Sequence, residues 1–551
     1  MQKLMATTAA TAAFLIGGTY AADYTWMANP ADANWNATSL NWNSGAAWVD
    51  NSSAPNNALF LTSSQKAISI PSGETRHVNN MTVGGANYTF TGGDIGLNGT
   101  LLVTNTACTI NSRIAAKKAS GLDYSTSTRV TFNSKSSGVL NPGANVTNVV
   151  GAMTVTGKLT LSSGVTQLGA PKNATGDSAM LYVCGNWNNF NTTSLGILEV
   201  AGGTLYATQQ FYVDANQYAQ VTVKDGGKVV MPSAEWLNGL NKPARLTVSD
   251  GGEFRVSVLR ACSGSASQVN LNEGGLIAVR RIAAVKSTNQ TKFLFNGGRL
   301  QSRDGIENFL DASLTEDQWN ATIKFAVGAG GAVFDASNGQ PIFWTRPLVS
   351  DAAQDGGVRK FGTGILVFKH SNDYNGKTVV ESGGVQLRVD NALPPGSTVR
   401  LGAADAYIDG GTFDSSYPYS EQWIGRVEGL GQVRWCGNMH ITNSVAPAAN
   451  GTLDIQKALD LRGDYEIAAD ANGCGCIKLA ANQDISSLAL KVVNLSAFNK
   501  DAPYTTYKIL DAPNGYTGKF AVGNLVGPWC VKYTLTAAYL VYKKGMMISV
   551  K

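Results

Sequence analysis

The stretch "LTVSDGGEFRV", Leu246–Val256, contains the pattern that decides the fold of this chain. Apolar and polar residues alternate up to Asp250, the alternation stops at Gly251 and Gly252, and it resumes at Phe254. Alternation with a period of two is typical of a β-strand with one buried face, and an Asp-Gly pair between two such runs indicates a tight turn. The stretch therefore predicts two short strands joined by a corner.

The same phrase occurs five times in succession at a nearly constant spacing. Its first glycines are Gly202, Gly226, Gly251, Gly274 and Gly297, at intervals of 24, 25, 23 and 23 residues. An apolar residue follows each of them by three positions: Leu205, Val229, Phe254, Ile277 and Leu300. Another precedes each by two or three positions: Val200, Val223, Val248, Leu271 and Phe295. Separate hairpins would need no fixed period, whereas repeats of this length stack because one unit cannot bury its apolar face alone. We therefore predict a β-solenoid in which each glycine pair is a corner of one coil.

The composition of the chain agrees with a β-rich extracellular protein. The 551 residues include 61 glycines, and only 15% are charged, well below the usual fraction of about 25%. Hydrophobic residues make up 44% of the chain and lie in short alternating runs, which argues against disorder. The net charge of +5 is small for this length and, without a basic run, gives no reason to expect a nucleic-acid partner.

Residues 1–21 are predicted to be a secretory signal peptide. Lys3 precedes an apolar run that ends at Gly17 and Gly18, and small residues surround Ala21. The alternative is an N-terminal membrane anchor, although the run is short for a spanning helix. No later stretch approaches about 18 apolar residues, so no transmembrane segment is expected in the mature chain.

Residues 22–67 are unusually rich in tryptophan and are predicted to form a cap over the first coil. Trp26, Trp35, Trp42 and Trp48 lie within 23 residues. The first coil of a solenoid exposes its core and one strand edge, which bulky side chains can cover. The alternative is a platform on which sugars stack, because exposed indole rings present a large apolar face.

Most of the remaining chain is predicted to be strand. A parallel β-helix is expected over 68–402, closing coils over 403–520, and a C-terminal cap over 521–551 that contains Trp529, Tyr533, Tyr539 and Tyr542. The segment 306–327, "IENFLDASLTEDQWNATIKFAV", has the best short helical pattern in the chain. No Pro-rich or Ser-rich linker divides the chain.

The segment "GGVRKFGTGILVFKHSNDYNGKTVVESGGVQLRVDNALPPGSTVRLG", Gly356–Gly402, resembles the autotransporter-associated β-strand repeat of bacterial passenger domains. The family phrase runs from a lysine through Gly-x-Gly, an apolar strand, Asn-x-Tyr-x-Gly and Thr-x-Val to Gly-Gly. Its elements here are Lys360, Gly362, Gly364, 365–368, Asn372, Tyr374, Gly376, Thr378, Val380, Gly383 and Gly384. The Trp-rich start and the closing coils resemble the flanks of the same proteins. The resemblance implies a right-handed parallel β-helix with N- and C-terminal caps, secreted from a bacterium or displayed on its outer surface.

One feature of the family is missing from the expected organisation. An autotransporter ends in a membrane barrel that would need roughly 200 residues or more, whereas only the segment 521–551 follows the closing coils. The chain therefore resembles the barrel-less secreted relatives of these proteins.

An enzyme on the same scaffold is the main alternative, because parallel β-helices also carry polysaccharide lyases and glycosidases. Such sites need converging carboxylates or a calcium ion that holds an acidic substrate, and no Asp-Asp or Asp-x-Asp pair is present. Asp225, Asp250 and Glu273 precede the glycine corners, where their side chains are expected to hydrogen-bond to turn backbone. We expect no catalytic residue and no cofactor.

Histidine and cysteine residues give no signal for a catalytic or metal site. His77, His370 and His440 are far apart in the sequence, and no Gly-x-Ser-x-Gly motif is present. Seven cysteines are scattered along the chain, and the spacing of Cys474 and Cys476 is not that of a common zinc site. We predict buried or occasionally paired cysteines and no bound metal.

Four arginines form the candidate binding site. Arg260, Arg280, Arg281 and Arg303 follow their glycine corners by six to nine residues, so adjacent coils are expected to stack them in a basic stripe. Such a stripe suits acidic glycans or other cell-envelope components, and the alternative is an ordinary solvated face. The tripeptide Arg462–Asp464 matches an integrin-binding motif by letters alone and is discounted.

The sequence therefore predicts a structural or adhesive protein that binds through repeated surface contacts. A carbohydrate-active enzyme and a non-catalytic glycan-binding protein that uses the N-terminal tryptophans remain the alternatives.

Overall fold

The computed structural model describes residues 21–543 apart from short internal segments. The segments outside the description are 105, 117–128, 133–135, 169–180, 184–195, 208–210, 214–218, 239–242, 262–266, 287–288, 411–419, 435–437 and 499–505. The predicted signal peptide, residues 1–21, lies outside the described residues except for Ala21.

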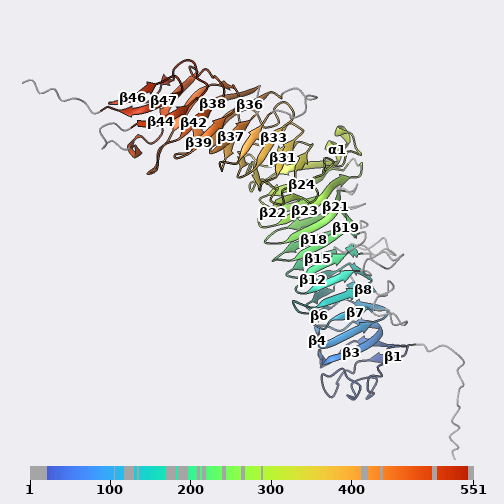
Figure 1. Cartoon of the computed structure of the whole chain (residues 1–551). Coiled ribbons are helices and arrows are strands. Elements are labelled where there is room, and N and C mark those ends of the chain that lie inside the picture. The colour runs from blue at the N-terminus through green and yellow to red at the C-terminus, as the bar shows by residue number, and fades with distance from the viewer. Residues whose placement is uncertain are drawn as a thin grey trace, which may run out of the picture.

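The chain winds into a long rod of stacked coils, a β-solenoid, as predicted (Figure 1). Among the described residues, all strand ladders are parallel except the two that the last strand, β47 (Ala537–Tyr542), makes. The described helices are α1 (Glu316–Thr322) and the 3-10 turn η1 (Leu495–Ala497). Figure 1 shows the rod bending near β24 and β31, with α1 on the outer side of the bend.

Three faces of parallel strands run along the first part of the rod. Face A contains β1 (Asp23–Thr25), β2 (Asn56–Phe60), β5 (Thr100–Val103), β8 (Arg129–Phe132), β11 (Ala152–Val155), β14 (Leu181–Val183) and β17 (Phe211–Val213). Face B contains β6 (Ala107–Ile110), β9 (Ser137–Leu140), β12 (Lys158–Leu161), β15 (Gly196–Ala201), β18 (Ala219–Lys224), β20 (Ala244–Val248), β22 (Gln268–Asn272), β24 (Thr291–Asn296), β26 (Ile323–Val327) and β29 (Leu348–Ser350).

Face C continues through the bend into the closing coils. It contains β7 (Ile114–Ala116), β10 (Thr147–Val150), β13 (Val165–Leu168), β16 (Thr204–Ala207), β25 (Arg299–Ser302), β27 (Ala332–Asp335), β30 (Val358–Phe361), β32 (Thr378–Val380), β34 (Thr398–Leu401), β41 (Gly463–Ile467), β43 (Leu488–Val492) and β45 (Ala521–Val522). Longer strands turn a corner and join two or three faces: β3 (Ala67–Val83), β4 (Tyr88–Leu97), β19 (Lys228–Asn238), β21 (Glu253–Ala261), β23 (Leu276–Ala284), β36 (Gln422–Gly429) and β38 (Met439–Pro447), the last of which also pairs with β40 (Asp460–Leu461).

A second sheet, face D, follows face C in each coil of the later part of the rod. It contains β28 (Ile342–Trp344), β31 (Ile365–Phe368), β33 (Gly384–Leu387), β35 (Tyr407–Asp409), β37 (Gly431–Arg434), β39 (Thr452–Ile455), β42 (Cys476–Leu479) and β44 (Thr506–Asp511). β47 (Ala537–Tyr542) then pairs antiparallel with β44 and with β46 (Trp529–Tyr533), so the direction of the strands reverses at this end of the rod.

The apolar residues of the repeated phrase stack in two columns inside the rod. On face B, Val200, Val223, Val248, Leu271 and Phe295 are direct partners on successive coils. On face C, Leu205, Val229, Phe254, Ile277 and Leu300 are partners in the same way. All ten side chains are fully buried, and the predicted stacking is therefore confirmed. Each coil contributes little apolar area alone, and the stack buries it against both neighbours.

The two glycines of each corner have different roles. The first adopts the backbone conformation of the turn, and the second leaves room for the backbone of the preceding coil. Gly226 and Gly251 have φ values of 74° and 77°, which an L side chain rarely adopts. At Gly227 the backbone is ordinary, but an added Cβ would lie 2.0 Å from the Val200 carbonyl oxygen on the preceding coil. The second glycine is therefore required by the close approach of two backbones.

The acidic residues at the corners act differently from what the sequence predicts. Asp225 and Asp250 have positive φ values of 52° and 49°, and within the described part of the chain neither carboxylate makes a hydrogen bond to the turn backbone. The prediction of side-chain capping at these two corners was wrong. Asp tolerates the left-handed region better than most residues, so backbone conformation explains its position there.

The short helix predicted within 306–327 is confirmed at α1. Thr315 caps its first turn, because its hydroxyl accepts from the Gln318 N–H while the Gln318 side chain accepts from the Thr315 N–H. Trp319 packs inward and donates its indole N–H to the Asp311 carbonyl at 2.7 Å. None of the described helices has the length and apolarity needed to cross a bilayer.

The corner geometry makes a paired prediction about stability. Gly227→Ala should lower the free energy of unfolding by about 2 to 4 kcal/mol, because its Cβ would collide with backbone that cannot rotate away. Gly226→Ala is the matched control in the same corner: a Cβ there has nothing within 4 Å, so only the cost of positive φ remains, about 1 to 2 kcal/mol. Denaturant unfolding of the full chain measures both. Equal losses would show that the approach of the coils is not what selects the second glycine.

Candidate functional site

Among the described lysines, Lys360 has the most perturbed pKa, and its contacts identify a structural role. Its side chain points into the rod from β30 and is fully buried. The ammonium donates to the carbonyls of Gly362 at 2.5 Å, Ser382 at 2.7 Å and Gly364. Burial lowers the pKa of Lys360 to about 8, whereas the three carbonyls favour the charged form. Because these carbonyls belong to two successive coils, Lys360 joins the coils and is not available to a ligand.

The other polar residues of this phrase are also used inside the coil. Asn372 is buried and donates to the Ala392 carbonyl at 2.6 Å while it accepts from the Leu348 N–H at 2.9 Å. The buried Tyr374 hydroxyl lies 2.5 Å from the Thr378 hydroxyl. The phrase that suggested a family is therefore a set of internal contacts between coils.

The four N-terminal tryptophans are buried and do not form an exposed platform. Trp26, Trp35, Trp42 and Trp48 are each 1% exposed or less. Their rings meet at large angles, as in the contact of Trp26 with Trp42, where the centroids are 5.1 Å apart at 85°. Sugar stacking needs an accessible ring face, so these tryptophans cannot supply the platform considered as an alternative.

Arg76 of β3 ties this tryptophan cluster to the first coils. Its buried guanidinium donates to the Trp35 carbonyl at 2.8 Å and pairs with Asp50 at 3.2 Å. Charge-assisted contacts of this kind fix the path of a segment that has little regular structure of its own.

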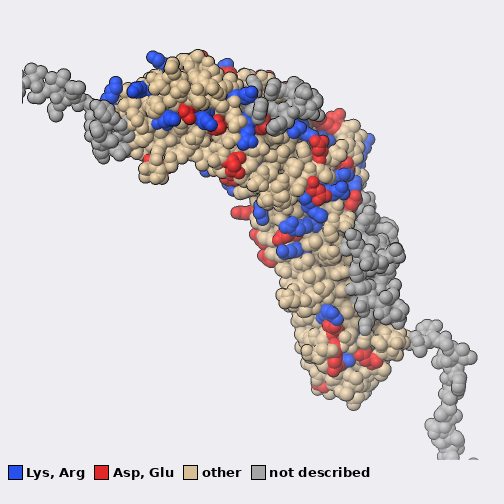
Figure 2. Space-filling view, viewed as in Figure 1, with Lys and Arg blue, Asp and Glu red and all other residues tan. Residues whose placement is uncertain are grey.

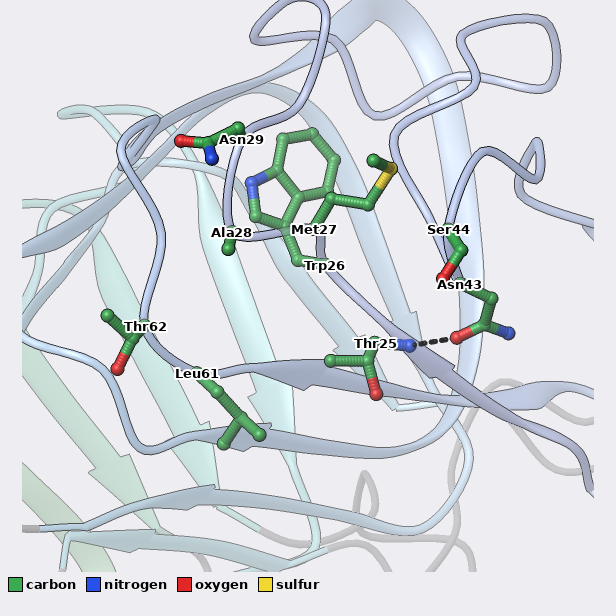
Figure 3. Close-up of a pocket in the computed structure, with 9 residues that line it drawn as sticks. All are labelled: Thr25, Trp26, Met27, Ala28, Asn29, Asn43, Ser44, Leu61 and Thr62. Carbon is green, nitrogen blue, oxygen red and sulfur yellow. Dashed lines mark hydrogen bonds between the residues drawn. The ribbon is translucent and has the colours of Figure 1, made fainter.

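An open cavity of about 860 Å³ lies beside the cluster (Figure 3). Figure 3 shows Met27, Leu61 and the turn of Asn43 and Ser44 around it, with the Thr25 N–H donating to the Asn43 side chain at 2.7 Å. The lining residues are Thr25, Trp26, Met27, Ala28, Asn29, Asn43, Ser44, Leu61 and Thr62. None of these described residues is titratable, so the cavity offers no general acid or base.

The histidines form separate carboxylate pairs in different parts of the rod. His77 lies 3.0 Å from Asp50, His370 lies 2.7 Å from Glu316, and His440 lies 2.9 Å from Asp460. Within the described residues, no group of three His, Cys, Asp or Glu side chains is placed to hold a metal ion.

The described cysteines are unpaired thiols: Cys108, Cys474, Cys476 and Cys530. Burial raises the pKa of Cys474 to about 11 and that of Cys476 to about 12. A thiol with a raised pKa holds little thiolate at neutral pH, so these residues are poor nucleophiles.

The structure places the four predicted arginines around one corner of the rod. Arg280 lies at the corner between faces C and A, and the Arg303 N–H donates to the Val279 carbonyl beside it. Arg260 of β21 and Arg281 of β23 lie on successive strands of face A. Neighbouring coils thus place the backbones of these four residues near one corner.

Carboxylates and carbonyls already occupy part of this basic stripe. Arg260 makes two contacts with Glu235, at 3.0 and 3.1 Å, and Arg280 pairs with Asp304 at 3.1 Å. Arg303 donates to the Pro232 carbonyl at 3.2 Å. Arg281 has no ion pair within the described part of the chain. Figure 2 shows the same mixture of Lys and Arg with Asp and Glu over this part of the rod.

The tripeptide Arg462–Asp464 is held within the coil. Arg462 makes contacts of 2.9 and 2.8 Å with Asp460, Gly463 opens β41, and Asp464 pairs with Lys491 at 3.3 Å. A segment whose charged groups are engaged by its own sheet does not present a mobile recognition loop.

One surface group was missed by the sequence analysis: a stack of Trp423 and His440 on β36 and β38. The ring centroids lie 4.0 Å apart and the planes are 9° from parallel. Nothing in the local sequence marks the two residues as neighbours, because they are 17 positions apart and meet only through the register of two coils.

Comparison with known proteins gives one informative relative. The chain is 24% identical over 442 residues to a protein described as Adhesin BmaC autotransporter, from Brucella suis biovar 1 (strain 1330). The match covers 67% of this chain and 12% of that protein, so the chain spans about an eighth of its length. No protein-family profile matches the chain. The chain is thus a β-solenoid similar to part of an autotransporter adhesin.

The Lys360 contacts predict a large loss of stability on removing the ammonium. Lys360→Met should lower the free energy of unfolding by about 2 to 5 kcal/mol, because three buried carbonyls lose their donor. Arg359→Met is the matched control on the same strand: Arg359 points outward and pairs with Glu381 at 3.5 Å, and exposed pairs contribute at most about 1 kcal/mol. The denaturant midpoints of the two variants measure this difference in stability. Similar midpoints would contradict the structural role of Lys360.

The tryptophan cluster predicts destabilisation without a direct effect on ligand binding. Trp35→Ala should cost about 3 to 5 kcal/mol and speed hydrogen exchange in β2 and β3. Leu40→Ala is the control, because Leu40 is in the same segment but 58% exposed, and it should leave exchange unchanged. A Trp35→Ala variant with normal exchange but lost glycan binding would restore the platform hypothesis.

Proposed function

We propose that this chain is a non-enzymatic, adhesin-like rod, secreted or displayed on a bacterial surface, that binds acidic glycans or similar anionic envelope components. The observation that carries the proposal is the combination of a solenoid with a 442-residue similarity to an autotransporter adhesin. The resemblance of Gly356–Gly402 to the autotransporter-associated repeat supports the same family.

The shape of the rod favours binding by many weak contacts. A solenoid presents the same kind of surface on every coil, so a long polymer can contact several coils at once without a deep pocket. The avidity of such contacts can exceed the affinity of each one by orders of magnitude.

The basic stripe of Arg260, Arg280, Arg281 and Arg303 is the proposed contact for anions. Arg281 has no ion pair among the described residues, whereas Arg260 and Arg280 would exchange their carboxylate partners for the ligand. Exposed ion pairs contribute little to stability, so such an exchange has a low energetic cost. The attraction is electrostatic and falls with salt, because the Debye length shortens to about 3 Å at 1 M.

A carbohydrate-active enzyme remains the second candidate function, and the scaffold alone cannot decide between them. The acids and histidines of the described residues lie in separated pairs rather than around one cleft. This distribution supports binding over cleavage.

The stripe predicts salt-sensitive binding that two substitutions weaken. Binding of immobilised polygalacturonate or lipopolysaccharide should fall about three- to tenfold in the double variant Arg280→Gln with Arg281→Gln at about 50 mM salt, and the difference should vanish at about 500 mM. The readout is surface plasmon resonance with the mature chain from Ala22.

The control is a second pair of exposed arginines on face C. Arg359→Gln with Arg400→Gln also removes one ion-paired arginine and one without an ion pair in the described residues. An equal loss of binding in the two double variants would show that the stripe acts only through the overall positive charge of the chain. New reducing ends in the polysaccharide would instead favour the enzyme.

A further inference from the structure

The surface of the closing coils carries an aromatic group whose position is unusual in this protein. Trp423 is 37% exposed and is the most exposed aromatic side chain among the residues that the structure describes. The other aromatic side chains lie inside the rod or are partly covered. An indole that remains in contact with water has an apolar face that a ligand could bury.

The orientation of the ring is fixed by contacts on two sides. Trp423 donates its indole N–H to the Glu421 carboxylate at 3.0 Å. One ring face lies on the His440 imidazole, with the centroids 4.0 Å apart. His440 is held in turn by Asp460 at 2.9 Å, and Arg462 anchors Asp460 through two contacts. The stack therefore stands as a rigid ledge over β36, β38 and β40, which are direct neighbours in the sheet.

The coil on the other side of Trp423 leaves space beside the ring. On that coil, the Gly396 N–H donates to the Trp423 carbonyl at 2.9 Å. Gly396 has no side chain, and a Cβ built on it would have nothing within 4 Å. Among the described residues, Gly396 therefore contributes no side chain over the ring face opposite His440.

Carboxylates surround the ledge and define what can bind. Asp390, on the coil of Gly396, accepts the Glu421 N–H through one carboxylate oxygen at 2.7 Å and is exposed. Glu421 and Asp460 lie 3.6 and 2.9 Å from the two imidazole nitrogens of His440. Carboxylate oxygens accept hydrogen bonds from hydroxyl groups but repel anions.

From this arrangement we infer that Trp423 and His440 form a binding site for a neutral hexopyranose unit of a glycan. The apolar face of the sugar ring would stack on the open face of Trp423, and its hydroxyl groups would donate to Glu421 and Asp390. Uronic acids and sialic acids would be excluded by the same carboxylates. The site is separate from the basic stripe, since the two lie on different coils and the stripe favours anionic ligands whereas this site favours neutral ones.

The test uses the full mature chain labelled with 5-fluorotryptophan and observed by fluorine NMR. The Trp423 resonance is assigned as the one absent from Trp423→Phe. The probes are hexasaccharides of glucose, mannose and N-acetylglucosamine, with a galacturonate hexasaccharide as the acidic control. We expect at least one neutral probe to shift the Trp423 resonance and the acidic probe to leave it unchanged.

Variants extend the test to affinity. Trp423→Ala should weaken binding of the effective neutral probe by about tenfold or more, and Trp423→Phe should retain part of it. Leu535→Ala is the control for an exposed apolar side chain, because Leu535 is 90% exposed elsewhere on the rod. Absence of a shift with every neutral probe, or an equal shift with the acidic one, would overturn the inference.

The outcome is independent of the stripe. The variant Arg280→Gln with Arg281→Gln should leave the Trp423 shift unchanged, so loss of acidic-polymer binding and loss of neutral-sugar binding are separate results. A neutral-probe shift that disappears in the arginine variant would also contradict the assignment to Trp423.

Discussion

The closeness of successive backbones at the glycine corners is the constraint on which the rest of this structure depends. Strands of one sheet lie about 4.8 Å apart, and this spacing persists where the chain changes face. At Gly227, Gly252 and Gly275 a Cβ would approach a carbonyl oxygen of the preceding coil within 2.0 to 2.3 Å. Side chains are therefore excluded from the corner, and the strands on both sides of it keep their register. That register places Val223 on Val248 and Val229 on Phe254 along the length of the rod.

In the later coils, a buried lysine stabilises the close approach of successive backbones. Where face C turns into face D, the tight loop at Gly362 and Gly364 leaves carbonyls pointing into the rod. Lys360 supplies the missing donor from inside and also reaches Ser382 on the next coil. A buried ammonium is costly unless its hydrogen bonds are satisfied. Here the carbonyls that would lack a donor accept from the ammonium, so the hydrogen bonds offset the cost of burying both. Lys360, whose pKa burial lowers to about 8, is thus part of the scaffold.

On the surface of the rod, the same strand register also aligns polar and aromatic side chains of successive coils in rows, here called ladders. Residues from different coils become neighbours at the sheet spacing, as Arg280 and Arg303 do at one corner and Trp423, His440 and Asp460 do on another side. Ladders suit binding of extended polymers, because contacts repeat along one direction. They rarely make several groups converge on one atom, which catalysis requires. The similarity to an autotransporter adhesin agrees with this division between a binding surface and a catalytic cleft.

The sequence by itself determined the solenoid, its coil length and its buried columns. Residues such as Leu205, Val229 and Phe254 recur at the period of one coil, and a local pattern that repeats at a fixed interval carries its own register. The same periodicity led to the prediction that the four arginines form one stripe. It could not show that Glu235 and Asp304 pair with two of them, because those partners come from other coils and depend on side-chain direction.

Only the tertiary structure decided which aromatic residues are exposed. The crowded tryptophans near the N-terminus were predicted to cap the first coil, with a sugar platform as the alternative. They are buried, which removes their large apolar surface from water and excludes the platform. Trp423 attracts no attention in the sequence, and its stack on His440 exists only because two coils align residues 17 positions apart. Exposure and cross-coil contact are properties of the packed stack, which no single strand contains.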